Sequence, residues 1–177
     1  MRLSDDIKIR AARNQDAVEI ARIHVEAWRD AYAALLPPEY LARLDPRIEA
    51  ARWNRASGSR LENTLVADCD GEVAGYAIIG PARGQRTPPP ANPMSGEIYA
   101  LYVETDWREQ GIGRALVNDA FDRFRKRGLT QAVIWCLEGN FAARGFYQRC
   151  GGKCLSQAKV EEVGGMTLPV VGYGWEL

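Results

Sequence analysis

The sequence predicts one α/β domain, in which segments typical of strands and segments typical of helices alternate along the chain. The chain has 177 residues, 46% of them apolar and 26% charged, which is an ordinary composition for one domain with a sizeable core. From the N-terminus the predicted element order is βααβββαβαββ. Near the middle of the chain, a glycine turn joins an apolar strand to an amphipathic helix, a connection typical of α/β domains.

The N-terminal part is predicted to contain one strand followed by a long helix. Ile7 to Ala11 has the pattern of a strand, and Asn14 is a suitable N-cap for the helix, which Pro37-Pro38 ends. The apolar face of this helix is predicted to comprise Val18, Ala21, Val25, Trp28, Tyr32 and Leu35.

The next part is predicted to be a second helix and a hairpin. Pro46 to Ser57 has a helical pattern, and the strands Thr64 to Ala67 and Val73 to Ile79 flank Asp70-Gly71, a dipeptide typical of tight hairpin turns. Gly80 to Gly96 carries five of the nine prolines, which predicts a loop because proline restricts φ.

A strand, a turn and a helix follow in the stretch from Glu97 to Leu116. Ile98 to Val103 is apolar and rich in β-formers, and Thr105 to Gln110 is polar. From Gly111 onward apolar residues form a helical stripe, and Gly128 follows a basic last turn, as expected of a C′ residue. The stripe comprises Ile112, Leu116, Val117, Ala120, Phe121 and Phe124.

The C-terminal part is predicted to contain three more strands and one short helix. Gln131 to Cys136 is the fifth strand, and Asn140 to Arg149 is the helix. The last two strands are expected near Lys153 to Val160 and Met166 to Trp175.

The turn before Gly111 indicates a phosphate site. A strand, a glycine turn and a helix N-terminus leave backbone N–H groups unpaired and directed at one point. A dinucleotide fingerprint requires a small final residue where this chain has Leu116, and a Walker loop requires a Gly-Lys-Ser/Thr sequence, which does not occur. A turn that only joins a strand to a helix is the alternative interpretation.

Two motifs resemble those of GCN5-related N-acetyltransferases, the GNAT family. The hexapeptide Arg108-Glu109-Gln110-Gly111-Ile112-Gly113 resembles the family's R/Q-x-x-G-x-G/A signature, and Asn140 to Gly151 resembles its N-x-x-A-x-x-F-Y-x-x-x-G-F segment. One residue departs from this pattern, because Gly152 stands where the family usually has phenylalanine. The resemblance implies a GNAT fold with a mixed, mostly antiparallel sheet of about seven strands and about four helices. It implies a single domain over residues 1–177, with its core at about residues 7–176.

The resemblance also implies acetyl-CoA as cosubstrate and a set of residues that bind it. Tyr147 would lie beside the thioester sulfur and protonate the departing thiolate, and Asn140 would contact the pantetheine or the acceptor end. Both residues have structural alternatives, since Asn140 is a good N-cap and Tyr147 can be core. The expected cofactor-binding residues are Leu101, Tyr102, Val103, Arg108, Glu109, Gln110, Gly111, Ile112, Gly113, Arg114, Asn140 and Tyr147.

Glu97 is the candidate catalytic base, because family members that use a glutamate base carry it at this position before the glycine motif. An amine at neutral pH is mostly ammonium and must lose a proton before it attacks a thioester. The alternative is an ordinary exposed acid at the end of a strand. Trp28 and Tyr32 are candidates for lining the acceptor pocket or for simple core packing, and His24 is more consistent with a structural histidine than with a base.

The resemblance places the Gly80 to Gly96 loop over the acceptor mouth. Arg83 and Arg86 are therefore candidates for recognising an acidic substrate group or a CoA phosphate, with a solvated loop as the alternative.

Composition excludes several other classes of function. Twenty-three basic and twenty-three acidic residues cancel, so no overall field favours nucleic acid or an anionic membrane. The four cysteines form no C-x-x-C pair and His24 is the single histidine, so no metal site is expected. No apolar leader or membrane span is recognisable, and a reduced cytoplasmic protein is expected.

The predicted activity is direct transfer of an acetyl group from acetyl-CoA to a primary amine. The acceptor is expected to be a small-molecule amine or a peptide N-terminus, and whether the chain forms a homodimer stays open. Two other classes remain: a non-catalytic acyl-CoA-binding sensor and a nucleotide-binding oxidoreductase.

Overall fold

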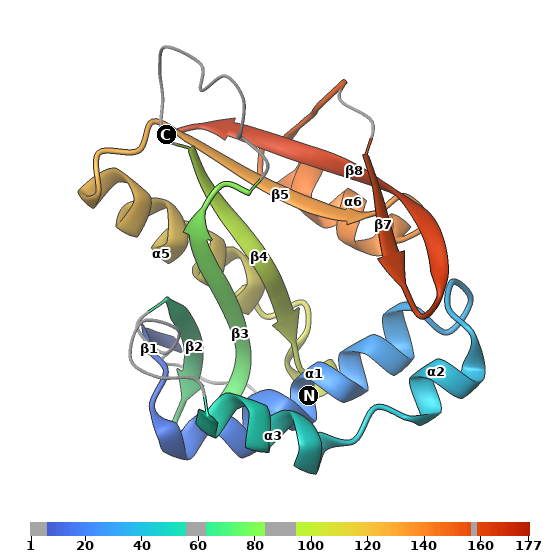
Figure 1. The fold of residues 1–177 in the computed structure, drawn as a ribbon. Coiled ribbons are helices and arrows are strands. Elements are labelled where there is room, and N and C mark those ends of the chain that lie inside the picture. Colours follow the sequence, from blue (N-terminus) through green and yellow to red (C-terminus); the bar gives the residue numbers. More distant parts are fainter. Residues whose placement is uncertain (1–6, 56–62, 84–94, 157–158) are drawn as a thin grey trace. The chain divides into compact units, whose positions relative to one another are not determined.

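The computed structural model describes residues 7–55, 63–83, 95–156 and 159–177, which form two compact units (Figure 1). The first unit comprises Met1–Ile78 and Ala100–Asp119, and the second comprises Ile79–Tyr99 and Ala120–Leu177. Strands β3 (Glu72–Pro81) and β4 (Ser95–Val103) and helix α5 (Ile112–Lys126) each run through both units. Hydrogen-bonded strands follow the order β1-β2-β3-β4-β5-β8-β6, with β7 on β8.

In the first unit, β1 (Ile7–Ala11) pairs antiparallel with β2 (Thr64–Cys69), and β2 pairs antiparallel with β3. The β2–β3 hairpin turns at Asp70 and Gly71, whose φ angles of 53° and 90° suit a two-residue turn, as the Asp-Gly sequence predicts. Helices α1 (Ala17–Ala31), α2 (Pro38–Ala42) and α3 (Pro46–Arg55) complete this unit together with its part of α5.

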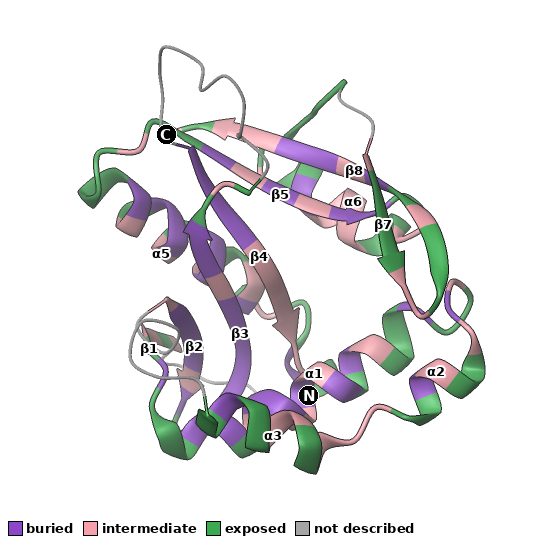
Figure 2. Ribbon diagram, in the orientation of Figure 1, coloured by how far each residue is buried: buried purple, intermediate pink, exposed green. Residues whose placement is uncertain are grey.

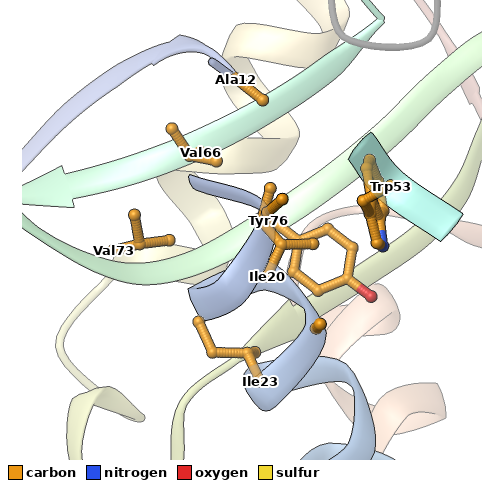
Figure 3. Close-up of a cluster of buried hydrophobic side chains, with 9 residues drawn as sticks. Ala12, Ile20, Ile23, Trp53, Val66, Val73 and Tyr76 are labelled. Atoms are coloured by element: carbon orange, nitrogen blue, oxygen red, sulfur yellow. The ribbon is translucent and has the colours of Figure 1, made fainter. Parts of the chain in front are cut away.

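The core of the first unit lies where α1 and α3 pack against the β1–β3 strands (Figure 3). Tyr76 is fully buried, and the Trp53 indole meets its ring edge-on at a centroid distance of 6.0 Å. Figure 2 shows the buried residues along β2 and β3. The other buried members of the cluster are Ala12, Ala17, Ile20, Ala21, Ile23, Val66 and Val73.

The sequence prediction of the first helix needs correction at three points. Val18 is 61% exposed, because the buried stripe of α1 instead includes Ile20 and Ile23. Asn14 begins a 3-10 turn and does not cap the helix, whose N-cap is Asp16. The helix also ends at Ala31, before the two prolines, and a short helix, α2, follows that was not predicted.

In the second unit, β4 runs parallel to β5 (Gln131–Leu137) over the register Ser95↔Gln131 to Ile98↔Ile134. β5 pairs antiparallel with β8 (Met166–Glu176) along its full length. The predicted strand from Lys153 to Val160 is two strands, β6 (Lys153–Cys154) and β7 (Lys159–Val163), which both pair with β8. The described residues therefore contain eight strands where about seven were expected.

The ends of the predicted Gly80 to Gly96 loop belong to strands. β3 continues to Pro81 and β4 begins at Ser95, while residues 84–94, including Arg86, lie outside the described part of the chain.

Helix α5 ends as the sequence predicts, and helix α6 (Phe141–Arg149) follows β5. Gly128 has a φ of 75°, its N–H donates to the Arg125 carbonyl, and the Leu129 N–H donates to the Phe124 carbonyl. This pair of bonds is a Schellman motif, which requires a left-handed residue such as glycine. Among the described residues, no helix has the length and apolar character needed to cross a membrane.

An ion-pair cluster fixes the entry to α1. Arg10 makes a two-pronged contact with Asp16, at 2.7 and 2.9 Å, and also donates to Asp68 at 2.8 Å. Asp16 is 4% exposed and accepts a further bond from the Arg13 N–H at 2.6 Å. Burial alone would raise the pKa of Asp16, but the bonds from Arg10 and Arg13 outweigh it and hold the pKa below its usual range.

We expect Asp16→Asn to destabilise the protein by about 2 to 4 kcal/mol at pH 7, because it leaves Arg10 without its main partner. A pKa lowered by folding contributes stability above the unfolded value, about 4, and loses it as pH falls through the folded value. The difference between wild type and Asp16→Asn in denaturant unfolding should therefore shrink in acid. Asp122→Asn, in an exposed pair, is the control and should cost less than about 1 kcal/mol. An equal effect of the two substitutions would contradict this assignment.

Candidate functional site

The turn between β4 and α5 has the backbone geometry of an anion cradle. Glu109 and Gly111 both have left-handed backbone, with φ of 64° and 84°. The Ala115 N–H is bonded to the Gly111 carbonyl, so the Ile112 and Gly113 amides precede the first hydrogen bond of the helix. Such amides carry the positive end of the helix dipole and have no acceptor within the helix. The turn can therefore bind a phosphate through its backbone.

Side chains of the same motif hold the turn in place. The Arg108 guanidinium donates to Asp30 on α1 at 2.5 Å and to the Val103 carbonyl at 3.4 Å. The Gln110 side-chain amide donates to the Asp106 carbonyl at 3.0 Å. Both contacts fix the loop, so the expected roles of Arg108 and Gln110 in binding a cofactor stay predictions. Arg114 is exposed on the first turn of α5, and its role likewise stays a prediction.

The end of β4 that precedes this turn lies outside the register with β5, which stops at Ile98. Leu101, Tyr102 and Val103 are half-buried there. A strand edge of this kind offers amides and carbonyls that an extended ligand can pair with.

An aromatic cluster connects β4 to α1 within the first unit. The Trp28 indole N–H donates to the Tyr102 hydroxyl at 2.9 Å, and the Tyr32 hydroxyl lies 3.5 Å from that same oxygen. His24 Nδ1 is 2.8 Å from the Tyr76 hydroxyl, consistent with a structural histidine. Trp28 is half-buried and Tyr32 is buried, so both contribute to packing, and Trp28 also has surface that a ligand can reach. Their role as acceptor walls stays a prediction.

Glu97 is buried at 1% exposure on β4 and is held by Arg83. Its carboxylate accepts the Arg83 backbone N–H at 2.6 Å, the guanidinium Nη2 at 2.7 Å and Nε at 3.1 Å. The guanidinium also lies over the Tyr99 ring, 4.3 Å from its centroid. The interpretation of Glu97 as an exposed acid at the end of a strand is wrong. β4 already begins at Ser95, so Glu97 lies within the strand and its side chain is buried.

The sequence predicts Arg83 either as a ligand-binding residue or as part of a solvated loop, and its pairing with Glu97 is a finding of the structure. One signal could have indicated it: an acid in an otherwise buried strand requires a nearby cation, and Arg83 follows the adjacent strand. The Arg83 side chain is still 63% exposed, and its Nη1 makes no hydrogen bond with the described residues. Arg83 therefore contacts Glu97 through Nε and Nη2, and its Nη1 can donate to another group.

Tyr147 is buried on α6 among aromatic rings of the second unit. Its ring lies 5.8 Å from Tyr173 and 6.4 Å from Trp175 between centroids, with Phe146 at 5.4 Å. The ring is thus part of the core, as one of the two sequence interpretations expects. Whether its hydroxyl protonates a thiolate stays a prediction.

Asn140 caps α6, which confirms its structural interpretation. Its side-chain oxygen accepts the Ala143 N–H at 3.1 Å. The amide NH₂ makes no hydrogen bond with the described residues and can donate to a ligand, so its expected cofactor contact stays a prediction.

Gly152, which stands where the GNAT motif usually has phenylalanine, has a physical reason in this chain. A Cβ at position 152 would lie 2.6 Å from the Trp175 indole and 2.9 Å from the Tyr147 carbonyl oxygen. Trp175 also donates to the Cys150 carbonyl at 3.0 Å. The indole of Trp175 therefore occupies the space beside this turn, and a phenylalanine at 152 would not fit.

Comparisons with known proteins agree with this geometry. The family model described as "Acetyltransferase (GNAT) family" matches residues 18–152. The chain belongs to that family. It is 31% identical over 170 residues to the uncharacterized N-acetyltransferase YuaI of Bacillus subtilis, covering 96% of this chain and 92% of YuaI. The motif-based resemblance is thus confirmed, and the oxidoreductase alternative gains no support.

Solved structures show the same fold. One is PaiA N-acetyltransferase from Thermoplasma acidophilum in complex with coenzyme A, with a TM-score of 0.65, 18% identity and coverage of 94% of this chain and 98% of PaiA. Another is yncA, a putative acetyltransferase from Salmonella typhimurium with acetyl-CoA, with a TM-score of 0.66, 21% identity and coverage of 97% and 94%. The predicted GNAT fold is therefore confirmed.

No group of side chains in the described ranges is arranged to hold a metal ion. None of the four cysteines, all of which lie in the described ranges, is in a disulfide, and burial raises the pKa of the Cys136 thiol to about 11.

We expect Arg83→Gln to destabilise the protein by about 1 to 3 kcal/mol, because the buried Glu97 carboxylate loses its cation and keeps only donors without charge. Arg52→Gln is a matched control, since the Arg52 side chain is also 63% exposed but pairs with Glu49 within one surface helix. That control should cost less than about 1 kcal/mol. Denaturant unfolding of both variants measures the difference, and the Arg83 effect should largely disappear in a Glu97→Gln background.

Proposed function

We propose that this chain is an acetyl-CoA-dependent N-acetyltransferase that moves the acetyl group directly to a primary amine. The observation that carries the proposal is the left-handed Gly111 followed by the Ile112 and Gly113 amides at the start of α5. This geometry suits a pyrophosphate, whose oxygens can accept bonds from backbone amides without meeting a side chain. Coenzyme A carries such a pyrophosphate, and the structures of PaiA and yncA contain coenzyme A or acetyl-CoA.

The rest of the cofactor would extend along β4. Pantetheine contains two amide groups, and Leu101 to Val103 lie where β4 has left its register with β5. Main-chain bonds to these residues would orient the arm by the same pairing that adds a strand to a sheet edge. Asn140, with its free NH₂ group, is a further proposed contact.

The chemistry requires a base for the acceptor, and we assign that role to Glu97. The carboxylate takes a proton from the acceptor ammonium, directly or through a water, and the freed nitrogen lone pair attacks the thioester carbon. Arg83 is hydrogen-bonded to the Glu97 carboxylate in this structure, so an incoming ammonium must compete with the guanidinium for the same oxygens. Arg83 thereby keeps the Glu97 carboxylate hydrogen-bonded until an acceptor arrives.

The departing thiolate requires a proton as the carbon–sulfur bond breaks, and we assign Tyr147 as its donor. A phenol with an ordinary pKa near 10 carries its proton at neutral pH. The aromatic contacts with Tyr173 and Trp175 fix the ring, which suits a positioned acid. Trp28 and Tyr32 are proposed to line the acceptor pocket from α1.

A non-catalytic acyl-CoA sensor is the second candidate. The observation in its favour is that Arg83 engages both Glu97 oxygens. Release of free CoA thiol in the presence of an amine panel separates the two functions, because a sensor binds acetyl-CoA without releasing the thiol.

We expect Gly113→Val to weaken coenzyme A binding by about 100-fold or more. The side chain would stand where the phosphates approach, and loss of two charge-assisted hydrogen bonds costs about 3 kcal/mol or more. Gly113 does not have a positive φ, so valine there strains no left-handed backbone. Calorimetry measures the affinity, with Asn118→Val on the exposed side of α5 as the control. An unchanged affinity in a folded Gly113→Val variant would refute the cradle.

Glu97→Gln should lower kcat/KM by about 100-fold or more at pH 7, because glutamine keeps the size of the side chain and removes its basicity. The rate should recover as pH approaches the pKa of the acceptor amine, where the base is no longer needed. Glu138→Gln, an exposed acid after β5, serves as control and should follow the wild-type profile. If Glu97→Gln also follows that profile at full rate, Glu97 is not the base.

Tyr147→Phe should lower turnover by about 10 to 1,000-fold while coenzyme A affinity changes little, as expected from loss of a general acid. Tyr173→Phe removes a phenol from the same aromatic group and should leave turnover near the wild-type value. Steady-state rates and calorimetry on both variants provide the comparison. Equal turnover in Tyr147→Phe would assign Tyr147 to the core alone.

A further inference from the structure

The second unit contains a cleft of about 470 Å³, a size within the range of small-molecule sites, on the face of the sheet that carries Trp135. We propose that this cleft binds an acidic group of the acceptor, so that the substrate is an amine that also carries a carboxylate or a similar anion. This inference rests on the proposed function, and it names the substrate class. The residues that carry it are Arg83, Trp135, Lys153, Lys159, Gly174 and Glu176.

β8 has glycines at two successive positions on this face of the sheet, and Gly174 lines the cleft. Gly172 pairs with Trp135 and Gly174 with Val133 across the β5–β8 ladder. A Cβ at Gly172 would lie 2.9 Å from the Trp135 ring, and one at Gly174 would lie 3.0 Å from Leu155. The side chains of Trp135 and Leu155 therefore pack directly against the backbone of these two glycines, and both side chains line the cleft together with Gly174.

Cations outnumber acids on the cleft wall. Arg83, Lys153 and Lys159 line it, while Glu176 is the one acid among the described residues that line it. Lys159 places its Nζ 3.7 Å from the centroid of Trp135, and neither lysine has a carboxylate partner among the described residues. Glu97 forms an ion pair with Arg83, and the negative charge of Glu161 on β7 also favours the charged form of Arg83. The charges of Lys153 and Lys159 thus exceed the single charge of Glu176. These two ammonium groups, and the Arg83 Nη1 that makes no hydrogen bond with the described residues, are donors that suit an anion.

The same arrangement connects the cleft to the proposed base. Arg83 touches Glu97 with Nε and Nη2 and lines the cleft, so an acid that binds Arg83 competes with Glu97 for the guanidinium. Binding of the acidic group would loosen the ion pair and give Glu97 room to accept the ammonium proton. A neutral amine carries no anion that could bind Arg83 and weaken its contact with Glu97.

The test compares acceptors that differ only in the acid: phenylalanine, phenylalaninamide and phenethylamine, together with amino acids that hold the carboxylate one or two carbons further from the amine. Acid-bearing acceptors should have the higher kcat/KM. In the double variant Lys153→Gln/Lys159→Gln, KM for them should rise by about 10 to 100-fold, the equivalent of one charged hydrogen bond lost. KM for the neutral amines should not change. Lys126→Gln, an exposed lysine at the end of α5, is the control.

A binding experiment without acetyl-CoA gives an independent readout. Glutarate, succinate and inorganic phosphate should each be tested for a rise in Tm, which the double variant should lose and Lys126→Gln should keep. A rise with phosphate alone, or an equal rise in the double variant, would overturn the inference.

Failure of the inference and failure of the proposed function are distinguishable. If neutral amines are acetylated with the same kcat/KM as acid-bearing amines, the proposed acetyl transfer stands and the site for the acidic group is refuted. If neither coenzyme A binding nor thiol release is seen with any amine, the proposed function fails, and the Tm experiment still decides whether the cleft binds anions.

Discussion

A carboxylate removed from water requires a cation and hydrogen-bond donors, and Glu97 imposes this requirement on the second unit. Arg83 meets it entirely, and the surrounding chain is arranged to keep Arg83 in reach. The Ala82 N–H donates to the Ser95 carbonyl at 2.9 Å, and the Tyr99 hydroxyl donates to the Pro81 carbonyl. The end of β3 is thus tied to the start of β4 on both sides of the ion pair. Arg83 also lines the cleft, so the proposed base and the cleft share this one contact.

The parts of the fold with strong local signals could be predicted from the sequence. β1, the Asp70-Gly71 hairpin and the body of α5 up to Gly128 lie where periodicity and turn residues indicate. Elements of a few residues, such as α2 and β6, are too short to show a period, and tertiary contacts decide them. The turn between β7 and β8 had a usable signal, because Gly164-Gly165 are both left-handed and Gly-Gly is typical of two-residue hairpins.

The candidate site likewise has one part that local sequence signals predict and one part that they do not. Its backbone part follows from local chemistry, since a glycine in a turn and the first amides of a helix need no distant partner. The side-chain part depends on contacts between residues far apart in sequence. Trp28 meets Tyr102 across a helix and a strand, and Trp175 fills the space beside Gly152. No periodicity or motif contains that information, so the contact of Trp175 beside Gly152 could not be predicted. The partner of Arg83 had only the indirect signal of an acid within an apolar strand.

The pairing of β8 has a consequence for how the second unit assembles. One edge of this strand bonds to β5 over Val170–Glu176, and the other bonds to β7 and then to β6. All three partners precede β8 in the chain, so none of them has its antiparallel neighbour until β8 has been synthesised and docked. The β5–β8 and β6–β8 ladders therefore form late and between residues far apart in sequence, whereas β7 and β8 form a local hairpin. Shortening β8 from its C-terminal end would remove pairs of both β5 and β6 and leave the β7 hairpin in place. A fusion partner attached after Leu177 would have to leave that end of β8 free to close the sheet.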